Sequence, residues 1–191
     1  NYGKAKDSFK QALSGDERNL VARIGLGNVY LREKDGTAAE EEFSLAIEIA
    51  PQYSFSYSDR SRARIMNNDP IGALEDLSKA ISLDPDFYWY YIDRGKLLLA
   101  VFAEEEAAKN DYDRAIGLDP EYFLPYVYRA GILEQQGKLK EAAADYRMVV
   151  KLNPDYYYAY EPLGLILYRE KEWEEAVPYL QKAYERNREA Y

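Results

Sequence analysis

The chain has 191 residues, of which 47% are hydrophobic and 31% are charged, and its formal net charge is −9. It contains no cysteine and no histidine, which excludes disulfides, thiol nucleophiles and zinc sites built from these residues. The acidic excess disfavours nucleic-acid binding, because phosphate backbones repel it, and no apolar run is long enough for a membrane-spanning helix. We therefore expect no metal, no cofactor, no nucleic-acid partner and no membrane span.

The compartment stays open between cytoplasm and periplasm, since both tolerate a chain without cysteine. The sequence begins at Asn1 rather than at a methionine, so we expect a fragment or a mature protein that has lost its leader. Tyrosine is unusually frequent, at 20 residues, and requires a structural explanation.

Prolines recur at a fixed interval along the chain, each preceded by a similar segment (AIEIAP, AISLDP, AIGLDP, VVKLNP). Their spacings are 34, 35 and 34 residues, at Pro51, Pro85, Pro120 and Pro154. A period of this length indicates a stacked repeat protein. With the proline as the thirty-second residue, a half repeat in 1–19 precedes repeats 1 to 5, which span 20–53, 54–87, 88–122, 123–156 and 157–191. The third repeat carries one extra residue, expected near Phe102–Glu106.

Each repeat is predicted to contain two helices. Apolar residues recur at helical spacing in the second half of a repeat, as at Leu74, Leu77 and Ile81. Turn signals separate the halves: Asp69 is a predicted N-cap, and Pro70 follows it at the first helical position, which needs no backbone donor.

Two further local features concern helix ends. Thr37 and Glu40 have the spacing of a capping box. Pro162 and Pro178 fall inside the two predicted helices of repeat 5, where a proline removes a backbone hydrogen bond. We expect both prolines to distort this last repeat.

The repeats agree in phase with a known pattern over essentially the whole chain. Repeat 1 shows it most completely, with Leu26, Gly27, Tyr30, Ala39, Phe43, Ala46 and Pro51. The sequence resembles the tetratricopeptide repeat family. The resemblance implies an all-α fold, a right-handed α-solenoid of antiparallel helix pairs with about eleven helices in a single array over 1–191. It also implies a non-enzymatic scaffold for protein–protein interaction.

Two columns of the array differ from the family pattern. Position 7, usually leucine, is arginine in repeats 2 to 4, and position 23 in the same repeats is aspartate. We predict half-buried structural pairs that join the two helices of a repeat, because a buried arginine without a carboxylate is costly. The pairs are Arg60 with Asp76, Arg94 with Asp111, and Arg129 with Asp145. An arginine ladder that binds a ligand is the alternative.

In the family, the first helices line a concave groove through positions 2, 5, 9, 12 and 13. Carried over to this sequence, these positions form an apolar and aromatic surface with scattered positive charges. The residues expected to contact a partner are Phe55, Arg62, Met66, Trp89, Ile92, Lys96, Leu124, Val127, Tyr158, Tyr168 and Arg169. An extended or helical peptide with apolar anchors is the expected ligand, because aromatic residues and arginine often dominate binding energy. The alternative is that these residues only pack between neighbouring helices.

Some members of the family hold the acidic tails of chaperones in a carboxylate clamp. Of the required residues this chain supplies only Asn28, while the other slots hold Ile24, Asp59, Trp89 and Asp93. We therefore expect no binding of that kind.

Two other functions are compatible with parts of the sequence. An enzyme that works with carboxylates alone has candidate residues in 104–106 and 172–175, but acidic residues also favour helix starts. We expect no catalytic residues. The second alternative is self-association into a homodimer through exposed end helices.

Overall fold

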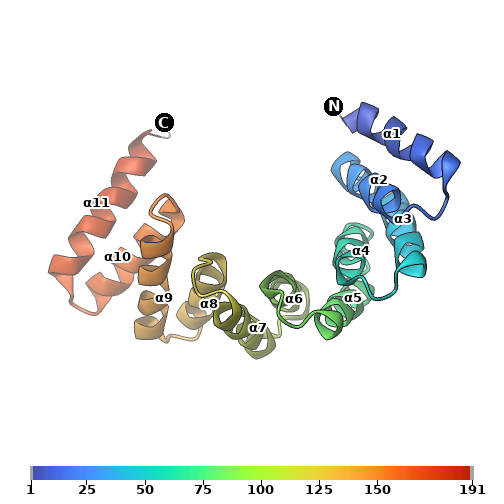
Figure 1. Cartoon of the computed structure of the whole chain (residues 1–191). Helices are drawn as coiled ribbons and strands as arrows, with labels where there is room; N and C mark the ends of the chain where they lie inside the picture. Colours follow the sequence, from blue (N-terminus) through green and yellow to red (C-terminus); the bar gives the residue numbers. More distant parts are fainter. Residues whose placement is uncertain (1, 190–191) are drawn as a thin grey trace. The chain divides into compact units, whose positions relative to one another are not determined.

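A computed structural model describes residues 2–189 of the protein (Figure 1). This part of the chain contains eleven α-helices, one 3₁₀ helix (η1) and no strand. The prediction of an all-α solenoid with about eleven helices is confirmed. Within residues 2–189 no helix is both long and apolar enough to cross a membrane.

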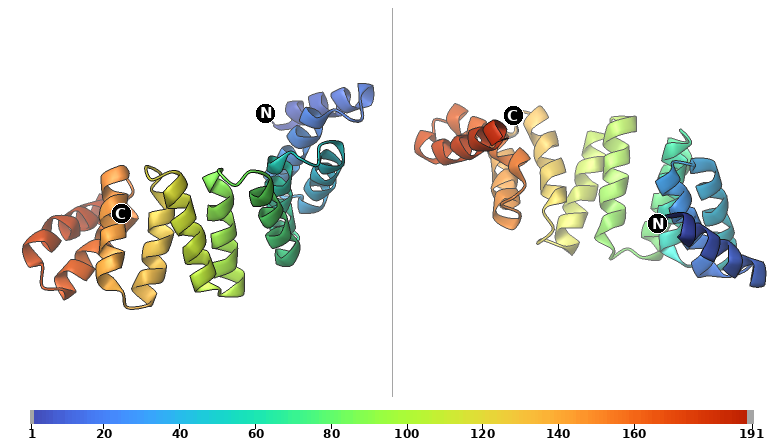
Figure 2. Two further views of the ribbon diagram at one scale, coloured as in Figure 1. Left: turned by 60° about the horizontal axis from the view of Figure 1, so that its bottom comes forward. Right: turned by 90° about the horizontal axis from the view of Figure 1, so that it is seen from above.

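The chain divides into two compact units, which are described separately. The N-terminal unit (Asn1–Ala103) contains α1 Tyr2–Gly15, α2 Leu20–Glu33, α3 Gly36–Ile49, α4 Ser54–Met66, α5 Pro70–Leu83 and α6 Tyr88–Phe102. The C-terminal unit (Glu104–Tyr191) contains α7 Glu105–Leu118, α8 Leu124–Gln135, α9 Leu139–Leu152, η1 Tyr157–Ala159, α10 Tyr160–Arg169 and α11 Trp173–Glu189. In the C-terminal unit, α7, α8 and α9 lie side by side (Figure 2).

Side-chain caps start several helices. Asp69 accepts a hydrogen bond from the backbone N–H of Gly72, as predicted, and Pro70 is the first residue of α5. The prediction of a capping box at Thr37 is wrong. Asp35 caps α3 by accepting from the N–H of Ala38, so Thr37 already lies inside the first turn.

A left-handed residue follows the first helix of every repeat. The positive φ angles occur at Lys34, Asn68, Ala103, Gly137 and Lys171. Only one of the five is a glycine, although this region of φ is unfavourable for other residues. The spacing of this column rises to 35 residues between Asn68 and Ala103. The extra residue of the third repeat therefore lies within α6, at the near edge of the expected range.

The prolines of repeat 5 disturb its helices less than expected. The chain forms η1 before α10, so α10 begins at Tyr160 and Pro162 falls in its first turn. A first-turn N–H has no partner within the helix, and its loss is harmless there. Pro178 does lie inside α11, which nevertheless runs as one helix from Trp173 to Glu189.

The backbone carbonyl of each proline that follows a second helix accepts a hydrogen bond from a tyrosine hydroxyl. The carbonyl oxygens of Pro51, Pro85, Pro120 and Pro154 lie 3.1, 3.0, 3.2 and 2.9 Å from the Oη atoms of Tyr57, Tyr91, Tyr126 and Tyr160. The four tyrosines are buried. Each bond fixes the start of a first helix against the turn before it, which accounts for part of the tyrosine content.

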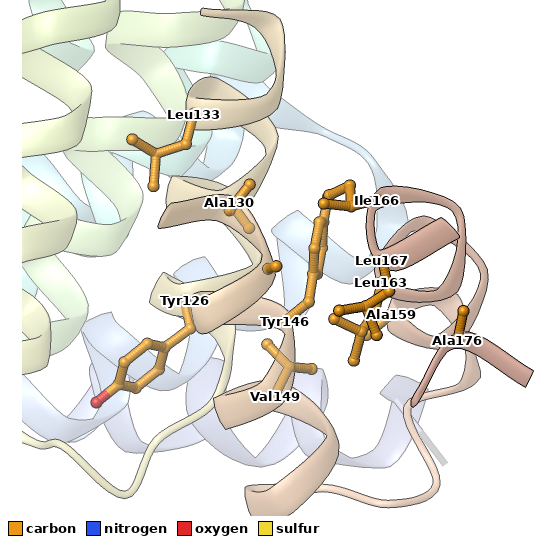
Figure 3. Close-up of a cluster of buried hydrophobic side chains, with 12 residues drawn as sticks. Tyr126, Ala130, Leu133, Tyr146, Val149, Ala159, Leu163, Ile166, Leu167 and Ala176 are labelled. Atoms are coloured by element: carbon orange, nitrogen blue, oxygen red, sulfur yellow. The ribbon is translucent and has the colours of Figure 1, made fainter. Parts of the chain in front are cut away.

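Alanine columns let the helices approach closely. The second helices bury alanines completely, at Ala39, Ala46, Ala73, Ala80, Ala108, Ala115 and Ala142. Larger side chains fill the remaining space. In the C-terminal unit, Tyr146 and Val149 of α9 face Leu163, Ile166 and Leu167 of α10 (Figure 3). This packing positions the first helices, which carry the candidate site.

Candidate functional site

Two of the three predicted arginine–aspartate pairs lie within one unit each, and in both the side chains are bonded at two points. Arg60 donates from Nε and Nη2 to Asp76 at 2.9 and 2.7 Å. Arg129 donates from the same atoms to Asp145 at 2.8 and 2.6 Å. Arg94 and Asp111 belong to different units, and their pairing stays a prediction.

The third guanidinium nitrogen reaches the preceding repeat. The Nη1 atoms of Arg60, Arg94 and Arg129 donate to position 25 of that repeat, at Ser44 (3.2 Å), Ser78 (3.4 Å) and Asp113 (2.6 Å). The same three guanidiniums lie 5.8, 5.9 and 5.7 Å from the rings of Tyr57, Tyr91 and Tyr126. Their donors are thus directed into the scaffold, which favours the structural interpretation over a ligand-binding ladder.

Burial is the main influence on the pKa of two carboxylates, Asp145 and Asp59. Burial raises the pKa of Asp145, and the hydrogen bonds and charge of Arg129 oppose that rise. Burial likewise raises the pKa of Asp59, against the opposing effects of Arg62 and Asn28. In return, the hydrogen bond with Asp145 raises the pKa of Arg129.

A cavity of about 320 Å³ opens between α4 and α6 in the N-terminal unit. Ile65, Leu97 and Val101 supply its apolar lining. Ile65 and Val101 are exposed large apolar side chains, whereas Leu97 is buried and forms the floor. The complete lining is Ser61, Arg62, Ile65, Asp93, Lys96, Leu97, Ala100 and Val101. We call it the α4–α6 pocket.

Two cations stand on the rim of the α4–α6 pocket. Arg62 lies 3.3 Å from Asp59, and Lys96 lies 3.4 Å from Asp93, each one turn earlier on its own helix. About half of each cationic side chain is exposed, at 53% and 48%. Only 19% of the Asp59 side chain and 29% of the Asp93 side chain are exposed, so each pair joins an exposed cation to a half-buried carboxylate.

Other predicted contact residues of the N-terminal unit divide by exposure. Phe55 and Met66 are exposed, and Trp89 is half-buried beside Tyr88, with ring centroids 5.8 Å apart. Ile92 is completely buried. The expectation that Ile92 contacts a partner is wrong, because its side chain packs in the interior.

Predicted residues of the C-terminal unit also fall into two groups. Leu124 and Val127 of α8 are partly buried, and Val127 packs on the hydrophobic core of the unit. Tyr158, Tyr168 and Arg169 are exposed. Tyr158 lines a second cavity, of about 540 Å³, between η1 and α11.

Aromatic rings extend these surfaces along the helix starts. Phe55 lies 5.6 Å from Tyr53 and 5.0 Å from Phe87, and Phe87 lies 4.7 Å from the buried Tyr90. In the C-terminal unit, Tyr156 similarly joins Phe123 and Tyr158, at 5.0 and 5.6 Å.

Of the lining of the α4–α6 pocket, the sequence-based selection included only Arg62 and Lys96. It did not include the lining residues Ser61, Ile65, Leu97, Ala100 and Val101. The selection also omitted Asp93, which lines the pocket beside Lys96. The sequence contained a signal for Asp93, because the pair Asp59 and Arg62 recurs one repeat later, with the same spacing, as Asp93 and Lys96.

The acidic clusters have structural partners. Glu105 and Glu106 accept from the side-chain amide of Gln136, and Arg147 pairs with Glu172 and Glu175 at 3.2 and 2.8 Å. Within residues 2–189 no group of acidic side chains is arranged to hold a metal ion. These carboxylates connect helices of the C-terminal unit.

The helix pairs and their stacking define a helical-repeat scaffold, a fold that supports protein–protein interaction. Family models for the tetratricopeptide repeat match residues 105–157 and 129–191, and a second such model matches residues 1–59. The chain therefore belongs to the tetratricopeptide repeat family. A search of the curated proteins found no significant match.

Several solved structures share this fold. A crystal structure of MamA is 22% identical with a TM-score of 0.74, and the match covers 87% of this chain and 90% of MamA. YrrB, described as a tetratricopeptide protein with an unusual peptide-binding site, is 18% identical with a TM-score of 0.73, covering 95% and 93%. A tetratricopeptide protein of Thermus thermophilus is 20% identical with a TM-score of 0.68, covering 87% and 90%.

Proposed function

We propose that the protein is a non-catalytic scaffold that binds a peptide segment of a partner protein in the α4–α6 pocket. One observation carries the proposal: an open apolar cavity whose rim holds two half-exposed cations. Exposed apolar side chains rimmed by polar groups are typical of interaction sites. The peptide-binding site named for YrrB, which has the same fold, also supports it.

The lining indicates the chemistry of the peptide. Leu97, Ile65 and Val101 suit one aliphatic or aromatic anchor side chain. The charged groups of the lining are Arg62, Lys96 and Asp93, and Asp59, the partner of Arg62, balances the remaining charge. A carboxylate next to the anchor would bond to the exposed ends of Arg62 and Lys96. We infer an acidic peptide with a single apolar anchor.

Panning a random-peptide library tests this function. The immobilised wild-type protein selects peptides, and their affinities are then measured by calorimetry for the wild type and for variants. We expect Ile65→Asp to weaken binding at least tenfold, or about 1.4 kcal/mol. Lys96→Glu should weaken it roughly threefold, since a rim charge contributes less than 1 kcal/mol.

Ile71→Asp is the matched control, because Ile71 is an exposed isoleucine on α5 that does not line the pocket. Selected peptides that lack a shared apolar anchor, or that bind Ile65→Asp as tightly as the wild type, would contradict the proposal.

A further inference from the structure

A cavity of about 390 Å³ lies among α7, α8 and α9 in the C-terminal unit. Its lining combines charged side chains of α7 and α9 with two residues of α8. These residues are Lys109, Asp113, Arg129, Leu133, Glu141 and Asp145. We call it the α7–α9 pocket. Because α10 packs on α9 beyond these helices (Figure 1), the pocket does not lie at the end of the stack.

The same columns of repeat 2 enclose an arginine. Leu133 follows Arg129 by four residues, as Arg64 follows Arg60. The Nε atom of Arg64 lies 3.0 Å from Glu40 of α3. Its Nη1 atom lies 2.9 Å from the carbonyl oxygen of Gly72 on α5. The guanidinium of Arg64 therefore bridges the two second helices that flank α4, and only 19% of its side chain is exposed.

Repeat 4 keeps the central carboxylate of this arrangement and lacks the guanidinium. Asp145 occupies the column of Asp76, and Leu133, whose side chain has no donor, occupies the column of Arg64. Asp76 pairs with two arginines, because Arg64 lies 3.1 Å from it in addition to Arg60. Asp145 pairs with a single arginine in the part of the chain that the structure describes. The α7–α9 pocket therefore lies where repeat 2 holds its second arginine.

The charges around the pocket favour a cation. Three carboxylates and two cations line it, which leaves one net negative charge. Arg129 is bonded to two of the carboxylates, Asp145 and Asp113. The third carboxylate, Glu141, is exposed, and it takes part in no hydrogen bond or ion pair with the other residues of 2–189. A cation in the pocket would thus meet one free carboxylate and one that has room for a second donor.

We propose that the α7–α9 pocket binds an arginine side chain of a partner protein, whose guanidinium takes the place that Arg64 fills in repeat 2. The guanidinium would donate to Asp145 and Glu141, and the apolar stem would lie on Leu133. Arginine suits the site better than lysine, because its planar group carries five donors and can bond two acceptors at once, whereas an ammonium is a compact point charge. This site is independent of the α4–α6 pocket, which belongs to the other unit.

An NMR titration tests the site and its preference for arginine. Leucine and alanine methyls are labelled, because Leu133 and Ala144 both line the pocket. N-acetylarginine amide is the probe, and its lysine and citrulline analogues are the controls, since citrulline has nearly the shape of arginine without the charge. We expect both methyl signals to shift and saturate with the arginine probe, with a dissociation constant in the millimolar range and roughly threefold or more below that of the lysine analogue.

The citrulline analogue should leave the signals of Leu133 and Ala144 in place. Three probes with equal effects, an arginine probe that shifts these signals no further than citrulline does, or arginine shifts confined to other methyls, overturns the proposal.

Two charge variants test which groups hold the cation. Glu141→Gln should weaken binding of the arginine probe roughly threefold or more. Glu75→Gln is the matched control, because it removes the same charge from an exposed position of α5, and it should leave the affinity unchanged. Lys109 occupies the column of Glu40, so Lys109→Glu restores the acid found in repeat 2 and should tighten binding by a similar factor. Unchanged affinity of Glu141→Gln, or weaker binding by Lys109→Glu, contradicts the proposal.

Leu133→Arg fills the pocket from within the chain. By analogy with Arg64, the new guanidinium should occupy the site and abolish binding of the arginine probe. Circular dichroism shows whether the variant keeps its helices, because Leu133 is buried. A folded Leu133→Arg protein that binds the probe like the wild type overturns the proposal. Glu141→Gln decides the question if Leu133→Arg does not fold, since Glu141 is exposed.

Discussion

Removing Asp145 should destabilise the protein more than removing both members of its ion pair. Asp145 accepts two hydrogen bonds from Arg129, and only 7% of its side chain is exposed. The single change Asp145→Ala leaves a half-buried guanidinium facing an apolar gap. The double change Arg129→Met with Asp145→Leu removes the charges together and fills the space with carbon.

The magnitudes follow from the contacts. Breaking a buried pair by removing one partner costs roughly 3–5 kcal/mol. Arg129 retains Asp113 as an ion-pair partner at 2.6 Å. We therefore expect Asp145→Ala to lower the free energy of unfolding by the lower end of this range, about 3 kcal/mol. Burial raises the pKa of Asp145, whereas the hydrogen bond with Asp145 raises the pKa of Arg129, so the cost of burial and the gain from pairing oppose each other. The double change should therefore cost less than about 1.5 kcal/mol.

Urea unfolding followed by tryptophan fluorescence measures these differences. The two tryptophans lie in different units, and a Trp89→Phe background leaves Trp173 as the reporter of the C-terminal unit. Lys109→Ala is the control, because Lys109 lies 3.5 Å from Asp113 in a half-buried pair four residues apart on one helix, and its loss should change stability by about 0.5 kcal/mol or less. A double variant as unstable as Asp145→Ala, or a single variant as stable as the wild type, would refute the reasoning.

Three further predictions concern local features. Lys171→Gly should stabilise the protein by up to about 1 kcal/mol by relieving a positive φ of 66°, whereas Gly137→Ala, at 72°, should destabilise it by a similar amount in thermal unfolding. Ser56→Ala should leave the free energy of unfolding unchanged or raise it by about 1 kcal/mol, since the buried Ser56 Oγ has no hydrogen-bond partner within residues 2–189; a loss of stability would contradict this. Burial raises the pKa of Tyr90 to about 12. Because the folded state binds this proton more tightly, its contribution of at most about 2.7 kcal/mol is present below pH 10 and is lost as the pH rises to 12. Tyr90→Phe should flatten that alkaline loss in urea titrations; an unchanged pH dependence would exclude Tyr90 as its source.

Much of the scaffold could be predicted because the repeat imposes one packing solution several times. The proline column identified helix ends, and the paired arginine and aspartate columns identified contacts that the structure contains at Arg60 and Arg129. The residues with positive φ that follow the first helix of each repeat were harder to predict from the sequence. Four of these five residues are not glycine. In four of the turns the residue after the left-handed one donates its backbone N–H to a carbonyl five residues earlier, as Asp35 does to Tyr30, and this bond closes the helix end.

The site was harder to predict than the scaffold. Family positions indicate which side of a helix faces the groove, but exposure depends on the neighbouring side chains. Ile92 is buried although its position belongs to the groove pattern, whereas Val101, outside that pattern, lines the α4–α6 pocket. Asp35 illustrates the same limit at a helix start, where either of two nearby residues had suitable chemistry and backbone geometry selected one.

Methyl NMR shows directly whether a peptide binds in the α4–α6 pocket. Isoleucine and valine methyls are labelled, and a peptide selected on the wild-type protein is titrated in. If the peptide binds there, the methyl signals of Ile65 and Val101 should shift and saturate together, while the signal of the exposed Ile71 on α5 should not shift. Saturating binding with shifts confined to other methyls, and none at Ile65 or Val101, would contradict this expectation.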